Sequence, residues 1–76
     1  MERDHLDILR EAVGKRQRKE TIERSLGQAV RAAGKDFSVY LAIIGEVRDF
    51  AQKHRLSELD AAAQLLGGGD DQAQND

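Results

Sequence analysis

The broadest apolar pattern in the chain lies in residues 36–54, which read DFSVYLAIIGEVRDFAQKH. On a helix at about 100° per residue, the apolar side chains of this segment gather on one side. The arc covers roughly half of the helix, whereas a surface helix usually carries an apolar stripe of about 100°. Its members are Tyr40, Ile44, Val47 and Ala51 along the centre, and Phe37, Leu41, Ile43 and Phe50 beside them. The pattern predicts a central helix with packing partners on more than one side.

Three other segments have helical periodicity. In residues 20–33, apolar side chains recur at i, i+4, i+7, i+8 and i+11, the most regular amphipathic pattern in the chain. Residues 2–13 have a similar but shorter pattern, with acidic side chains in the first turn. Residues 58–66 follow Ser57, whose hydroxyl is suited to cap a helix N-terminus. The chain is therefore expected to be all-α, with three to four helices.

The segment 34–36 predicts a tight connection between the second helix and the central one. Gly34 is suited to the left-handed position that follows a helix, and Asp36 is suited to cap the next helix. Helices 20–33 and 36–54 would then form a central αα-hairpin.

The connection between residues 2–13 and 20–33 is open to two interpretations. The segment 14–20, GKRQRKE, has no apolar side chain and no Pro that would force a break. On one continuous helix the two apolar stripes would point in nearly opposite directions. A long helix that serves two partners would tolerate this conflict, and a break near residues 14–18 would remove it. We expect the break.

The C-terminal part of the chain predicts a helix end and a tail. Gly67, Gly68 and Gly69 follow the last apolar side chains, and the remaining residues read DDQAQND. Glycine disfavours a helix, and a polar acidic segment has little apolar surface to bury. We expect one helical domain over residues 1–66 and a flexible, Gly-rich and acidic tail over residues 67–76.

The length of the chain constrains how the central helix is covered. A domain of 76 residues buries only about 60% of its unfolded surface, and the chain has no Cys for disulfides or thiolate metal ligands. We expect homodimerisation to complete the bundle, with helices 20–33 and 36–54 packing against their copies. Coverage of the central helix by residues 2–13 and 58–66 of the same chain is the alternative. The residues expected to form the interface or core are Leu26, Val30, Tyr40, Ile44, Val47 and Phe50.

Hydropathy argues against a membrane protein. The longest apolar run, Val39–Ile44, is far shorter than the roughly 20 residues of a membrane-spanning helix. The first residues mix acids with bases and lack the apolar core of a signal peptide. We expect a soluble cytoplasmic protein with no membrane partner.

Candidate catalytic groups are few and scattered. The hydroxyls and imidazoles follow no nucleophile motif, and no spacing resembles a metal-ligand set. These residues are Thr21, Ser25, Ser38, Ser57, His5 and His54. We therefore expect no enzymatic activity, no cofactor, no metal and no small-molecule substrate.

The charge distribution gives the clearest functional signal. Residues 1–56 carry all 12 Lys and Arg side chains against 9 acids, and residues 57–76 carry 5 acids and no base. Four of the cations cluster at Lys15, Arg16, Arg18 and Lys19, where they could contact phosphates. No aromatic side chain lies among them to stack on bases, which argues against single-stranded nucleic acid.

We expect a non-catalytic regulatory or adaptor protein that contacts a protein partner through its helices, as a homodimer. The alternative is a DNA-binding transcriptional regulator that uses residues 15–19 on phosphates. A third possibility is an inhibitor of a nucleic-acid enzyme whose acidic tail mimics phosphates.

Overall fold

The chain folds into helices connected by short turns. The computed structural model describes residues 1–75, and side chains within residues 1–67. The described residues form four helices, α1 (Arg3–Lys15), α2 (Ile22–Ala32), α3 (Phe37–His54) and α4 (Glu58–Asn75). The radius of gyration is 12.0 Å, close to the roughly 11 Å expected of a compact domain of this length. The expected all-α fold is confirmed.

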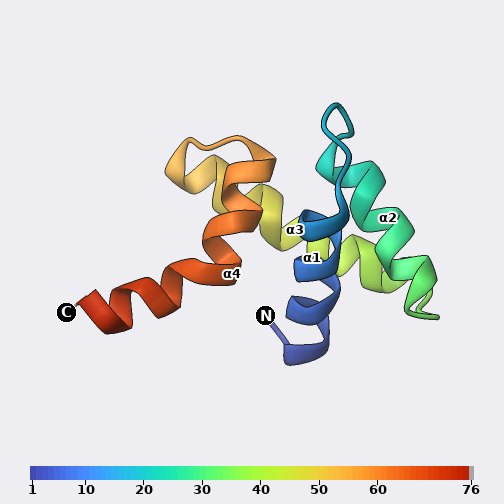
Figure 1. Ribbon diagram of the computed structural model, residues 1–76, viewed down its shortest axis with the longest axis horizontal. Coiled ribbons are helices and arrows are strands. Elements are labelled where there is room, and N and C mark those ends of the chain that lie inside the picture. The colour runs from blue at the N-terminus through green and yellow to red at the C-terminus, as the bar shows by residue number, and fades with distance from the viewer. Residues whose placement is uncertain (76) are drawn as a thin grey trace.

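Figure 1 shows how the helices are arranged. α1 and α2 lie side by side and run in opposite directions, and the loop between them projects from the bundle. α3 crosses behind α1 and packs against α1, α2 and α4. The long central helix is thus enclosed by helices from both ends of the same chain.

The core is built on the apolar arc of α3. Leu9 of α1 and Leu26 of α2 are fully buried against this arc, and Ala61 and Ala62 of α4 are buried beside it. Burying one Leu or Ile side chain contributes about 1.5–3 kcal/mol, so these contacts dominate the stability of the bundle. The fully or nearly fully buried side chains of α3 are Ile43, Ile44, Val47 and Ala51. In the structure, the apolar arc of α3 is therefore covered by helices of the same chain.

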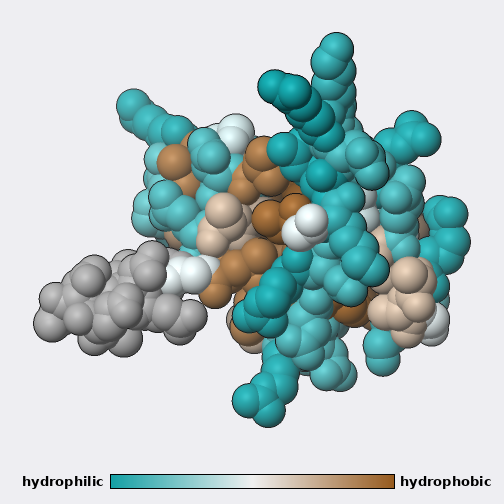
Figure 2. Space-filling view, in the orientation of Figure 1, coloured by the Kyte–Doolittle hydropathy of each residue, from teal (hydrophilic) through white to brown (hydrophobic). Residues whose placement is uncertain are grey.

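The edge of the core remains partly open to solvent. In Figure 2, apolar side chains are visible between α1 and α4, framed by hydrophilic ones. The half-buried apolar residues that edge the core include Met1, Val13, Leu56, Leu59, Leu65 and Leu66. Among the described residues, none of the helices combines the length and apolarity needed to cross a bilayer.

The turns follow local chemistry closely. α1 ends at Lys15 and α2 begins at Ile22, so the expected break is confirmed. Gly34 has φ +75°, and the backbone N–H of Lys35 donates to Val30 at 3.1 Å, as in a Schellman motif. The hydroxyl of Ser57 accepts from the backbone N–H of Asp60 at 3.0 Å, which confirms this N-cap.

Two local predictions were wrong. Asp36 occupies the N-cap position of α3, but its carboxylate accepts from the Ser38 hydroxyl at 2.6 Å instead of from a backbone N–H. This hydrogen bond is the main reason why the pKa of Asp36 is lowered. α4 continues to Asn75 instead of ending at Leu66.

The longer α4 has a simple physical basis. Each Gly costs a helix about 1 kcal/mol relative to Ala but does not block it as Pro does, and an existing helix extends more easily than a new one starts. The side chains of residues 68–75 and all of residue 76 lie outside the described part. The flexibility expected of the tail stays a prediction.

Arg48 connects three helices through its guanidinium. Its Nη2 lies 3.0 Å from Glu23 Oε2 on α2, and its Nε lies 3.1 Å from Glu58 Oε2 on α4. The hydrogen bond from Arg48 lowers the pKa of Glu23. Desolvation, followed by the nearby Glu23 carboxylate, raises the pKa of Glu58. The two carboxylates therefore share one cation unequally.

This sharing predicts different effects for two matched substitutions. Glu23→Gln should lower the free energy of unfolding at pH 7 by about 0.5–1 kcal/mol, the upper range for exposed ion pairs. Because the folded-state pKa of Glu23 is lowered, its contribution is complete above its ordinary value of 4.5 and is lost as the pH falls through the folded pKa. Glu58→Gln relieves an unfavourable charge and should leave stability unchanged or slightly higher. Urea unfolding at pH 7 and pH 3 checks both, and a larger loss for Glu58→Gln would contradict this account.

The end of α3 contains a residue in a costly conformation. Arg55 has φ 58° and ψ 49°, the left-handed region, and is the non-glycine residue with positive φ among those described. The turn is held because the backbone N–H of Leu56 donates to Ala51 at 2.8 Å. A left-handed L-residue costs roughly 1–2 kcal/mol.

Arg55→Gly should therefore stabilise the protein by about 1 kcal/mol and raise its melting temperature by about 4–8 °C. The control is Gln52→Gly, at an exposed position within α3, which should destabilise by about 1 kcal/mol. Thermal unfolding followed by circular dichroism measures both. A loss of stability in Arg55→Gly would show that its side chain matters more than its backbone conformation.

Candidate functional site

The basic segment 15–19 does not present four equivalent cations. Lys15 pairs with Glu11 at 3.3 Å. Arg16 turns back on its own loop and donates to the backbone carbonyl of Glu20 at 2.6 Å, with longer contacts to two other carbonyls of the loop. Arg18 and Lys19 are exposed, and their side chains have no polar partner among the described residues. The fold therefore leaves two of the four predicted phosphate contacts available.

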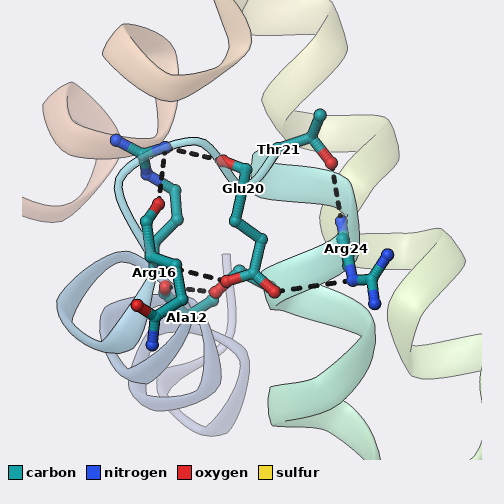
Figure 3. A network of polar contacts seen from close by, with 7 residues as sticks. Ala12, Arg16, Glu20, Thr21 and Arg24 are labelled. Carbon is teal, nitrogen blue, oxygen red and sulfur yellow. Dashed lines mark hydrogen bonds and ion pairs between the residues drawn. The ribbon is translucent and has the colours of Figure 1, made fainter.

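Figure 3 shows that Arg16 belongs to a network that closes the loop. The carboxylate of Glu20 accepts from the backbone N–H of Gln17 at 3.0 Å and lies 3.7 Å from Arg24 Nε. The hydroxyl of Thr21 accepts from the backbone N–H of Arg24 at 3.2 Å, which caps α2. The spacing of Arg16 and Glu20 and the Thr before an apolar run are the sequence signals for this network.

The candidate nucleophiles all make structural hydrogen bonds. Ser25 is buried, and its hydroxyl donates to the carbonyl of Ala12 at 2.6 Å, which joins α2 to α1. The hydroxyls of Thr21 and Ser57 cap helices, and that of Ser38 binds Asp36.

None of the hydrogen bonds of these hydroxyls among the described residues involves an imidazole. His5 is half-buried on α1, and His54 is exposed with its ring centroid 4.3 Å from that of Phe50. Within the described residues, no group of three or more potential ligands could hold a metal ion.

The residues predicted for the interface or core lie mainly in the core of one chain. Leu26, Val30, Ile44 and Val47 are at most 4% exposed. Tyr40 and Phe50 are half-buried at the edge of the same cluster. In the folded chain, a partner can therefore reach the last two and not the first four.

A different part of α3 has exposed apolar side chains. Phe37 is 66% exposed and Leu41 is 53% exposed. Ala42 and Gly45 are also exposed, and a Cβ added to Gly45 would meet no atom within 4 Å. We call Leu41, Ala42 and Gly45 the outward face of α3. Over about one turn it offers an apolar side chain next to small ones.

A groove runs between the outer side of α2 and the first turn of α3. Its volume is about 590 Å³. Arg24, Arg31 and Lys35 line it together with Phe37 and Tyr40. The two aromatic rings are stacked, with centroids 5.3 Å apart and an interplanar angle of 20°. We call this the cationic groove, and the basic segment predicted from the sequence, residues 15–19, does not line it.

The network of Figure 3 predicts that Arg16 and Arg18 contribute very differently to stability. Arg16→Ala should lower the free energy of unfolding by about 1–2 kcal/mol, because it removes a charged donor from a half-buried carbonyl. Arg18→Ala should change it by less than about 0.5 kcal/mol, as is usual for an exposed side chain. Urea unfolding of the two variants is the measurement. Equal effects would mean that Arg16 is not a structural residue.

Compared with known proteins, the chain matches no family model, no curated protein and no solved structure. Any function assigned to it therefore rests on the chemistry and geometry of its own residues.

Proposed function

We propose that the protein is a non-catalytic regulatory or adaptor protein that acts through protein–protein contact, that it is a homodimer, and that the outward face of α3 forms the dimer contact. In this proposal, α2 and α3 act together as the αα-hairpin that carries the binding face. The observation that supports it is Leu41, which is 53% exposed in the first half of the longest fully described helix. In this proposal another helix packs over Leu41, and the small residues beside it let the two helices approach closely.

The proposed contact differs from the one expected from the sequence. Leu26, Val30, Ile44 and Val47 are occupied within the chain and would be available only if the bundle opened. The outward face lies on the other side of α3 and is free while the core stays intact. A dimer through this face therefore costs no unfolding of the protomer.

The small residues favour a symmetric pairing of α3 with its copy. When two α3 helices pack antiparallel, Leu41 of one lies near Gly45 of the other, and the twofold symmetry repeats this contact. Since Gly45 has no side chain and open space above it, the helices can approach closely. The proposed interface is thus a Leu side chain in a shallow depression, formed twice.

The test is the mass of the full chain in solution. The unchanged protein should be a dimer by light scattering, and Leu41→Glu should weaken association by at least about 100-fold. Two leucines would lose their apolar contact, worth about 1.5–3 kcal/mol each, and two carboxylates would enter the interface. Gln64→Glu adds the same charge at an exposed position of α4 and should leave the dimer unchanged.

A monomeric protein at about 100 μM would rule out the homodimer. A dimer that Leu41→Glu leaves intact would place the interface elsewhere, and the half-buried apolar residues between α1 and α4 would be examined next.

A further inference from the structure

The geometry points to a second binding function, independent of the proposed dimer: the cationic groove is a site for single-stranded nucleic acid. Arg24, Arg31 and Lys35 would bind backbone phosphates, and the Phe37–Tyr40 pair would stack on a base. Proteins that bind single strands without sequence preference combine a cationic groove with aromatic side chains in this way.

The cations follow one side of α2. Arg24, Gln28, Arg31 and Lys35 are spaced i, i+4, i+7 and i+11, so they lie in a line along the helix and its C-terminal turn. α2 has 11 residues, and such a helix is about 16 Å long. Lys19 lines a neighbouring hollow together with Arg24, which extends the line towards the projecting loop. The track is long enough for successive phosphates of one strand.

Two of the acids near the groove are paired with cations. Glu23 lines it, but its carboxylate binds Arg48 at 3.0 Å. Glu20 lies 3.7 Å from Arg24, at the upper limit for an ion pair. Arg31 and Lys35 have no ionic partner within residues 1–67, the part whose side chains are described. The groove therefore offers Arg31 and Lys35 for phosphate oxygens. Asp36, next to Lys35 in the sequence, binds the Ser38 hydroxyl and has no cation partner within residues 1–67.

The aromatic pair makes a nucleic acid a better occupant than an acidic peptide. Phe37 is 66% exposed and stands at the end of the line of cations. Acidic side chains would pair with the cations but would not stack on an exposed aromatic ring, whereas every base has a face that stacks on it. The arginine guanidinium also matches the geometry of phosphate oxygens.

The sequence argued against single-stranded nucleic acid because the basic segment 15–19 has no aromatic side chain, and the groove differs in this respect. No aromatic side chain lies near residues 15–19, and Phe37 and Tyr40 are far from that segment. The turn at Gly34 brings the start of α3 back along α2, which places the rings beside Arg31 and Lys35. The fold thus brings the cations of α2 and the aromatic pair of α3 to one groove.

The test is a titration of the full chain against fluorescein-labelled oligo(dT) of about 15 nucleotides. Fluorescence anisotropy should detect binding at about 50 mM salt that weakens towards about 200 mM. Each phosphate contact on a single strand contributes about −0.7 to the slope of log K against log salt, so three contacts predict about −2.

Three variants separate the roles in the groove. Arg31→Gln combined with Lys35→Gln should weaken binding at least about 10-fold and flatten the slope by about 1.4. Phe37→Leu keeps an apolar side chain but removes the ring, and should weaken binding several-fold with no change in slope. Lys53→Gln, an exposed cation in the last turn of α3, should have no effect beyond about twofold. Circular dichroism confirms that each variant is folded.

Several outcomes would overturn the inference. The first is absence of binding at low salt with about 100 μM protein. The second is a loss of binding in Lys53→Gln equal to the loss in Arg31→Gln with Lys35→Gln. The third is displacement of the oligonucleotide by poly-glutamate to the same extent in Phe37→Leu as in the unchanged protein. The last result would identify an acidic protein partner. The mass of the unchanged protein in solution and its binding of oligo(dT) are separate measurements, so failure of the dimer and failure of this site are distinguished.

Discussion

The need to cover α3 governs the rest of the structure. Its apolar arc is too broad for one neighbouring helix, so α1, α2 and α4 each contribute buried side chains to it. Leu9 and Leu26 approach from the N-terminal half of the chain, and Ala61 and Ala62 from the C-terminal half. The small alanines let α4 lie close to α3, which compensates for the few large residues available in a short chain.

Hydrogen bonds and ion pairs of polar side chains join the helices that cover α3. Ser25 joins α2 to α1 inside the core, and Arg16 closes the loop between these helices. Arg48 joins α2 and α4 across α3. These contacts are individually modest, and each joins segments that the apolar core also holds together. Two of them occupy the Ser25 hydroxyl and the Arg16 guanidinium, which were candidate functional groups in the sequence.

The two surfaces proposed for binding are those that this arrangement leaves free. The outward face of α3 is available because its neighbours pack only against the opposite side. The cationic groove is available because it lies open between α2 and the first turn of α3. They adjoin near Phe37, yet one depends on aliphatic contact and the other on charge and stacking. A dimer through Leu41 and Gly45 would thus place two grooves on one assembly.

The sequence by itself determined the helices, because periodicity, helix caps and Gly34 act over a few residues. It therefore predicted the break after α1, the cap at Ser57 and the breadth of the arc on α3, but not the length of α4 or the role of Asp36. Only the tertiary structure decided which chain covers α3, which cations are free and where the aromatic pair lies. Arg16 and Arg31 are both arginines without a distinguishing sequence motif. In the structure, Arg16 donates to carbonyls of its own loop, whereas Arg31 lines the groove. Contacts between residues distant in sequence depend on how helices cross, and helix periodicity does not specify that crossing.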